Sequence, residues 1–167
     1  MNTEMKNILW HQFGAAIDML ENAIAACPET LWGTTISPAA FWYIAFHALF
    51  YLDLYLSETD KGFVPPPPFT LDEMDERGLL PDRIYTQQEL LRYLVHGREK
   101  CRSVITSMTD EQAAKRCGFE WLKISVAEAL LYNMRHVQHH AAQLNWMVSR
   151  AAGPAPRWVQ RTKDGLE

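Results

Sequence analysis

Hydrophobic residues recur every three or four positions along two stretches of the chain, a spacing typical of helices that bury one face. In the first stretch, from Thr3 to about Ala26, the stripe consists of Leu9, Trp10, Phe13, Ile17, Leu20 and Ile24. The second stretch follows Thr86-Gln-Gln-Glu89, which has the form of a capping box. Its stripe consists of Leu90, Leu94, Gly97, Cys101, Val104, Ile105 and Met108. Each stretch is predicted to form one long helix.

A third stretch, from Ser37 to Leu56, is apolar on all sides, and Asp53 is its only charged residue. Ser37 is predicted to cap this helix, with Pro38 in its first position. A four-helix bundle covers only about half of such a helix. We therefore predict that a second subunit covers the rest and that the protein is a homodimer. The alternative is a helix that is enclosed within a single domain.

The fourth predicted helix runs from about Leu122 to Arg150 and ends before Gly153-Pro154. Residues 57–85 contain four consecutive prolines and an acidic run, which predict an extended connection with at most one short helical turn. A connection of this length is uncommon unless it crosses over or covers something, and we expect it to border the functional site. No segment of five or more residues alternates as a strand does.

The predicted fold is thus all-α: a four-helix bundle over residues 1–152, with a long crossover between helices two and three. Residues 153–167 form a C-terminal tail, in which Trp158 is the candidate anchor. With 167 residues, of which 48% are hydrophobic, the chain fits one domain with a substantial core.

Charge and cysteine content narrow the possible functions. The net charge is −4 and the basic residues are scattered, so we expect no nucleic acid partner. The chain has neither a signal peptide pattern nor an apolar run long enough to cross a bilayer, which predicts a cytoplasmic protein without a membrane partner. Cys27, Cys101 and Cys117 show no metal or redox spacing and are predicted to be buried thiols.

Three of the six histidines lie in the segment Arg-His-Val-Gln-His-His of the fourth helix. His136 and His140 are four residues apart, so they project only about 40° from each other, at or within the apolar face. His139 points to the other side of His136. In the third stretch, His47 lies mid-way along the aromatic helix, where a single histidine is more often a hydrogen-bonded core residue than a ligand.

Imidazoles suit borderline divalent metals, and a catalytic site usually has three protein ligands and one open position. His136 and His140 need a third ligand from another helix, and His47 is the natural candidate. Val137 occupies the position at which zinc metalloproteases carry glutamate, which excludes that class. The alternative is three core histidines without a metal, because spacing alone cannot show that the rings converge.

The segment NMRHVQHHAAQLNW resembles the fourth-helix signature of the DinB-like superfamily, H-x-x-H-H-x-x-Q-L. The segment FWYIAFHALFYLDLYL resembles the second helix of that family, in which one histidine stands in an aromatic run. The resemblance implies a crossed four-helix bundle, frequent homodimers, and a divalent metal such as nickel or zinc held by His47, His136 and His140. Gln143 matches the glutamine of the motif. Ala141-Ala142 departs from the Arg-Gly that often precedes it, so no role tied to that arginine applies.

The resemblance also implies candidate functions, of which the first is a metal-dependent enzyme. Such a metal would act as a Lewis acid or activate a low-molecular-weight thiol, as in an S-transferase or a hydrolase acting on a small molecule. Asn133 and Tyr51 would orient a ligand or water beside the metal, or simply pack in the core. The alternative is a non-catalytic, stress-related homodimer that binds metal. An acidic and aromatic pocket would favour the enzyme, and a sealed metal site would favour the alternative.

Overall fold

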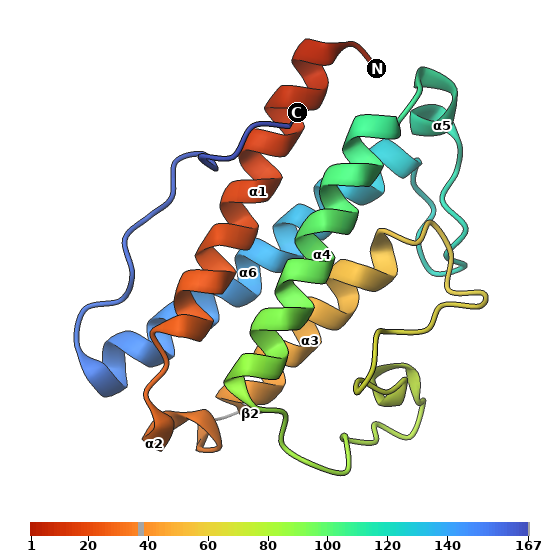
Figure 1. Cartoon of the computed structure of the whole chain (residues 1–167). Helices are drawn as coiled ribbons and strands as arrows, with labels where there is room; N and C mark the ends of the chain where they lie inside the picture. Colours follow the sequence, from red (N-terminus) through yellow and green to blue (C-terminus); the bar gives the residue numbers. More distant parts are fainter. Residues whose placement is uncertain (37–38, 167) are drawn as a thin grey trace.

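Four long helices form an antiparallel bundle in the computed structural model, which describes residues 1–36 and 39–166 (Figure 1). These helices are α1 (Thr3–Ala25), α3 (Phe41–Tyr55), α4 (Gln87–Ser107) and α6 (Val126–Ala152). The shorter elements are α2 (Glu29–Trp32), β1 (Thr35–Ile36), β2 (Ala39–Ala40), the 3-10 helix η1 (Asp72–Met74) and α5 (Asp110–Ala114). The prediction of an all-α bundle is confirmed.

The helix order around the bundle is α1, α6, α3, α4, because α1 and α3 each pack against α6 and α4. Helices α1 and α6 run in one direction, and α3 and α4 run in the other (Figure 1). The long crossover of residues 57–85 therefore joins two parallel neighbours, α3 and α4. This arrangement brings the second and fourth long helices into contact along the side where the predicted histidines lie.

Capping residues fix where the helices begin. Asn2 caps α1 by accepting a hydrogen bond from the Met5 backbone N–H at 2.9 Å. The predicted capping box of Thr86 and Glu89 is present at the start of α4. The fourth long helix starts later than Leu122, because Ser125 and Glu128 form a capping box that begins α6 at Val126.

The start of the second long helix differs from the prediction. Ser37 and Pro38, the predicted cap and first residue, lie outside the described residues. Ala39–Ala40 pair as an antiparallel strand with Thr35–Ile36, and α3 begins only at Phe41. The strand pairing uses the backbone groups that an earlier helix start would have needed.

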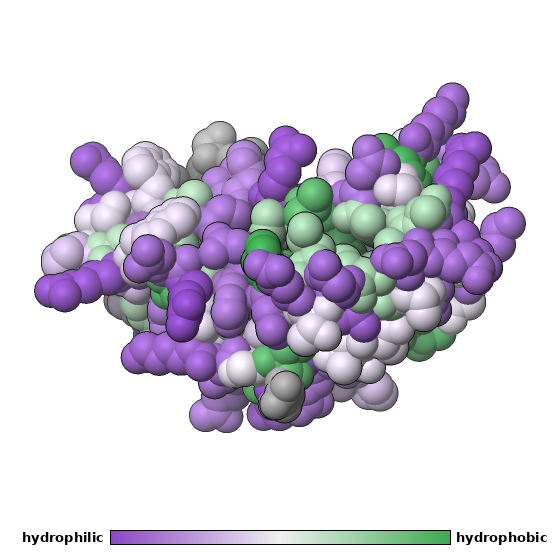
Figure 2. Space-filling view, turned by 90° about the horizontal axis from the view of Figure 1, so that it is seen from above, coloured by the Kyte–Doolittle hydropathy of each residue, from purple (hydrophilic) through white to green (hydrophobic). Residues whose placement is uncertain are grey.

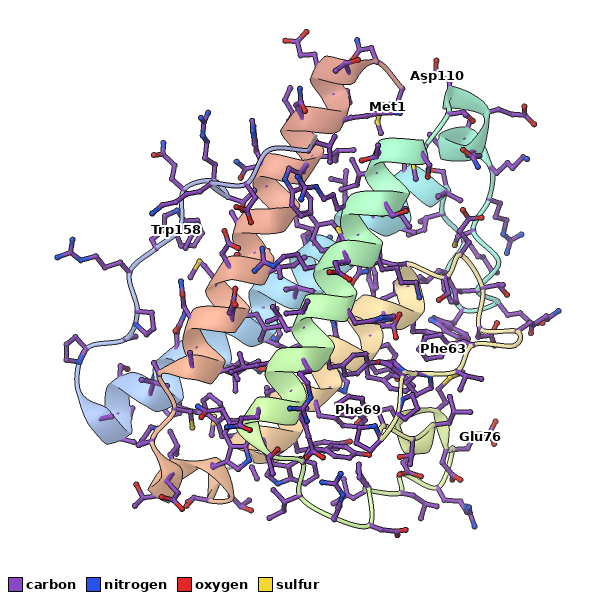
Figure 3. The ribbon with its side chains drawn as sticks, in the orientation of Figure 1. Met1, Phe63, Phe69, Glu76, Asp110 and Trp158 are labelled. Atoms are coloured by element: carbon purple, nitrogen blue, oxygen red, sulfur yellow. The ribbon has the colours of Figure 1, made fainter. Side chains whose placement is uncertain are left out.

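Helix α3 is covered within its own chain, and the crossover supplies much of the cover. Phe63 and Phe69 point from the crossover toward the bundle (Figure 3) and are only 8% exposed. The ring of Phe69 stacks on Tyr93 of α4 at 4.3 Å and packs on Phe46 of α3 at 5.9 Å. Most of α3 is therefore covered without a second subunit, and the strip of Tyr43, His47 and Tyr51 is only partly buried. The homodimer itself stays a prediction.

The C-terminal tail runs along α1, with an anchor other than the predicted one (Figure 1). Trp158 is 70% exposed, whereas Thr162 is buried and its N–H donates to the His11 carbonyl at 3.1 Å. A Cβ placed on Gly14 would lie 2.6 Å from Thr162 Cγ2, so α1 needs glycine where the tail crosses it. A small residue facing Gly14 thus holds the tail.

The polarity of the surface, the character of the helices and the burial of the cysteines each bear on the sequence predictions. Seen from the end where α1 begins, the surface is largely hydrophilic around a central hydrophobic group (Figure 2). None of the described helices combines the length and the apolar character that crossing a membrane requires. Cys27, Cys101 and Cys117 are buried free thiols, as predicted.

Candidate metal centre

The three predicted histidines meet between α3 and α6. The Nε2 atom of His136 lies 3.3 Å from Nε2 of His47 and 3.1 Å from Nε2 of His140. Among the residues that the structure describes, these three form the one group of histidine, cysteine or acidic side chains able to surround a metal ion. Their ligand atoms all lie within 4.8 Å of one another. The three rings therefore converge, which their spacing along the sequence could not show.

Hydrogen bonds at the far side of two rings fix which nitrogen carries the proton. His47 Nδ1 lies 2.7 Å from Oε2 of Glu73, and His140 Nδ1 lies 2.7 Å from Oε1 of Gln143. Carboxylate and amide oxygens accept hydrogen bonds, so Nδ1 is the donor in both rings. Both Nε2 lone pairs then face the centre of the cluster. Metal-binding histidines are commonly oriented in this way.

The spacing of the nitrogens suits a tetrahedral metal. Zinc-to-imidazole bonds are about 2.0–2.1 Å long, so two ligands of an ideal tetrahedron stand about 3.3–3.4 Å apart. The separations of His136 Nε2 from the other two Nε2 atoms, 3.1 and 3.3 Å, are close to that edge, and all three ligand atoms lie within 4.8 Å of one another. Three imidazoles would occupy three corners and leave the fourth for water or substrate.

Burial keeps two of these rings neutral. It lowers the pKa of His136 to about 3, and the nearby His140 and His47 lower it further in the same direction. Burial also lowers the pKa of His140 to about 4, followed by the effect of His47. Both rings are unprotonated near neutral pH, which is the state that binds metals.

His136 is held by packing rather than by a hydrogen bond. Its Nδ1 atom is buried and has no hydrogen-bond partner among the described residues. The ring packs against both Tyr51 and Tyr55, with centroid distances of 5.5 and 6.2 Å. These aromatic contacts set the direction in which its Nε2 points.

Of the three residues predicted to lie beside the metal ligands, two contact the histidines and the third joins the two helices. Gln143 contacts His140 directly, and Tyr51 packs its ring on His47 at 4.7 Å and donates to the Glu73 carbonyl at 3.3 Å. Asn133 is fully buried, and its side-chain N–H donates to the Leu52 carbonyl at 3.0 Å. That bond ties α6 to α3 and makes Asn133 a link between the two helices that carry the histidines.

Two further histidine positions follow the helical geometry. His139 is exposed and points away from the cluster, as the 100° step along α6 predicts. His96 lies on α4 and is also exposed. Neither belongs to the three-histidine group.

Sequence reasoning missed Glu73, which lies in η1 of the crossover. Its side chain is only 3% exposed and forms the hydrogen bond that orients His47. The acidic run in residues 57–85, expected to border the site, was the available signal. Nothing in that run distinguishes Glu73 from its neighbours Asp72, Asp75 and Glu76, because no periodic pattern fixes which side chain turns inward.

An open cavity of about 490 Å³ adjoins the histidines between α3, the crossover and α6. His47 and His136 form part of its wall, so a molecule inside would reach two of the three rings. Aromatic and acidic side chains form most of the remainder: Tyr51, Tyr55, Trp121, Tyr132, Glu73, Asp75 and Glu76. The three-histidine cluster is therefore open to a ligand of small-molecule size.

Two comparisons of the sequence with known proteins bear on the family of this chain. No curated protein matches the chain. A family model described as the DinB superfamily matches residues 12–144, a span that includes His47, His136 and His140. Because this match covers most of the chain and the predicted bundle is present, the chain belongs to the DinB superfamily.

Proposed function

We propose that this protein is a divalent-metal-dependent enzyme that transfers or hydrolyses a thiol-linked small molecule. Its metal, nickel or zinc, is held by His47, His136 and His140. One observation carries the proposal: three histidine rings converge, and two of them, His47 and His136, line an open, acidic and aromatic cavity. A purely structural histidine cluster has no need of an adjoining cavity.

The bound metal would supply Lewis acidity and lower the pKa of a thiol or water toward neutrality. The protein residues around it have separate tasks. Glu73 and Gln143 hold two imidazoles in the tautomer that presents Nε2. Tyr51 packs against His47 and His136 and limits their rotation. The aromatic wall excludes water from the inner end of the cavity.

Metal analysis of the purified protein tests the ligand set. We expect about one equivalent of nickel or zinc per chain, and loss of this metal in each of the variants His47→Ala, His136→Ala and His140→Ala. His139→Ala is the matched control, because His139 lies on the same helix and is exposed. Unchanged metal content in all three ligand variants would refute the assignment.

A screen of low-molecular-weight thiols against electrophilic substrates, with and without metal, tests catalysis. Turnover that requires both metal and thiol would support the enzyme. The alternative is a non-catalytic, stress-related homodimer whose open coordination position has no substrate. Absence of any metal-dependent turnover from a fully loaded protein would favour that alternative.

We also propose that the protein is a homodimer, although the apolar character of α3 is no longer the reason. It is supported by the family resemblance and by two large apolar side chains exposed on α6, Leu131 at 44% and Trp146 at 57%. Light scattering of the eluting peak measures the mass directly. A peak near twice the chain mass of 19.2 kDa is expected, and a peak at 19.2 kDa would contradict it.

A further inference from the structure

We propose that the cavity beside the three histidines binds an organic cation, a small molecule that carries an ammonium group. This inference rests on the proposed function and names the class of substrate for that site. It is carried by the aromatic wall of the cavity, by its acidic wall, and by one buried carboxylate oxygen that lacks a hydrogen-bond donor.

The aromatic wall extends from the histidines to the mouth of the cavity. Tyr51 and Tyr55 lie next to each other, with ring centroids 5.5 Å apart, and Tyr132 packs edge-on against Tyr55 at 5.3 Å. Trp121 continues the wall and is 51% exposed. The faces of tyrosine and tryptophan rings attract cations electrostatically, and several rings around one site select ammonium groups.

The opposite wall carries three carboxylates and no lysine or arginine. Asp75 is largely neutralised by Arg77, whose guanidinium donates to both carboxylate oxygens at 2.9 and 2.7 Å. Glu76 makes no ion pair with any described residue, and it lies at the outer edge of the crossover (Figure 3). Glu76 and Glu73 therefore remain to balance a cationic ligand.

Glu73 gives the most direct sign of a missing ligand. Its side chain is 3% exposed, and Oε2 is occupied by His47. The other oxygen, Oε1, is buried and has no partner with good hydrogen-bond geometry among the described residues, although burial and, after it, a hydrogen bond between Glu73 and the Tyr43 hydroxyl raise the pKa of Tyr43. A buried carboxylate oxygen without a donor is unfavourable. A hydroxyl or other donor on the part of a ligand that faces the histidines is a group that Glu73 Oε1 could meet there.

A second cavity, on the other side of His136, has the opposite character. It has a volume of about 610 Å³ and lies between α1, α6 and the tail. Arg135 and His139 line it, and no aspartate or glutamate does. Acidic groups therefore gather on only one side of His136, the side that also carries the cluster of tyrosines. The contrast indicates selection for charge at the first cavity.

The bound metal would add positive charge beside the histidines. The ammonium group of a ligand is therefore placed at the outer part of the cavity, near Trp121, Tyr132 and Glu76. The uncharged or anionic part of the same molecule faces the histidines.

Choline and its uncharged isostere 3,3-dimethylbutan-1-ol separate charge from shape. Calorimetric titration of the metal-loaded protein should give at least about tenfold tighter binding of choline. The variants Glu76→Lys and Trp121→Leu should each reduce choline affinity by about fivefold or more and leave the isostere unchanged. Glu99→Lys and Trp158→Leu are the matched controls, because both residues are exposed and neither lines this cavity.

Equal affinity for choline and the isostere would overturn the inference, as would choline binding that Glu76→Lys and Trp121→Leu leave intact. Metal content measured in the same samples distinguishes the two proposals. A protein that holds metal but shows no preference for choline refutes the cation site alone. A protein that prefers choline but holds no metal refutes the proposed function alone.

Discussion

Helix α3 carries a buried polar cluster on each of two faces, and the two clusters differ in whether their lone pairs are matched by donors. Toward α4, Asp53 is 1% exposed and accepts hydrogen bonds from Lys100 Nζ at 2.5 Å and Tyr93 Oη at 3.0 Å. Toward α6, the Nε2 atoms of His47 and His140 both face Nε2 of His136.

The Asp53 cluster is complete within the protein. Lys100 also donates to Ser57 Oγ at 2.6 Å, and His96 Nε2 lies 3.4 Å from Asp53 Oδ1. Burial, together with the charge and the hydrogen bond of Asp53, raises the pKa of Tyr93, so its hydroxyl remains a donor. Donors and acceptors are matched, and Asp53, Tyr93 and Lys100 line neither the cavity beside the histidines nor the cavity between α1, α6 and the tail.

The histidine cluster, in contrast, has more hydrogen-bond acceptors than donors. At least two imidazole lone pairs face a single neighbouring nitrogen, which can supply at most one proton. The difference teaches that a closed polar group on a helix face joins two helices, whereas a convergent set of acceptors beside a cavity needs an external partner. A divalent metal satisfies that need.

Among single substitutions, the largest expected effect on stability lies in the closed cluster. Lys100→Met leaves the Asp53 carboxylate buried without its main cation and should lower the free energy of unfolding by about 3 kcal/mol or more. Urea denaturation measures this loss. The exposed Lys123→Met is the control, and metal content should be unchanged in both variants. Loss of metal in Lys100→Met with a stable fold would break the division between the two clusters.

In the open cluster, Glu73→Gln weakens the acceptor that orients His47. Loss of such a supporting carboxylate typically lowers metal affinity about 10- to 100-fold, which a competition titration against a chelator of known affinity measures. Glu76→Gln is the control, because Glu76 lines the same cavity without a hydrogen bond to a histidine. Equal affinities in the two variants would show that Glu73 does not position the ligand.

The metal-free protein should lose stability as the pH falls below about 6.5. His136 and His140 have folded-state pKa values of about 3 and about 4, so the unfolded chain binds protons first. Each of them should contribute a slope of about 1.4 kcal/mol per pH unit between the unfolded and folded pKa values. Denaturation at several pH values measures the slope. The double variant His136→Gln/His140→Gln should flatten it, and an equally steep curve in that variant would exclude these rings as the cause.

The smallest effect is expected from Gln143→Leu, which removes the neutral acceptor at His140 Nδ1. One hydrogen bond of this kind contributes about 1 kcal/mol, so metal affinity should fall about fivefold. The same chelator competition detects this change. A loss as large as that of a ligand variant would mean that Gln143 does more than orient His140.

The sequence predicts most of this architecture where periodicity and capping signals are strong. The stripe from Leu90 to Met108 and the Thr86–Glu89 capping box define α4 almost to the residue. His136 and His140 are placed correctly because their relative direction depends only on the helical step. His47 was placed by the family resemblance and by its depth along α3, not by spacing.

The remaining features depend on contacts that periodicity does not encode. The cover of α3 comes from Phe63 and Phe69, in a segment rich in proline and without a repeat. Glu73 reaches His47 through the path of that same segment. The tail is held by Thr162 against Gly14, a fit between two small residues that no hydrophobic pattern signals. Irregular segments thus complete a site whose helical part is readable from sequence.

X-ray absorption at the metal edge of the zinc- or nickel-loaded protein tests the central claim most directly. The account predicts three imidazole nitrogens at about 2.0–2.1 Å in the zinc-loaded protein. It also predicts that His47→Ala, prepared in the same way, holds no metal with three imidazole ligands. A first shell with fewer than three imidazoles, or a spectrum of His47→Ala identical to that of the unsubstituted protein, would contradict it.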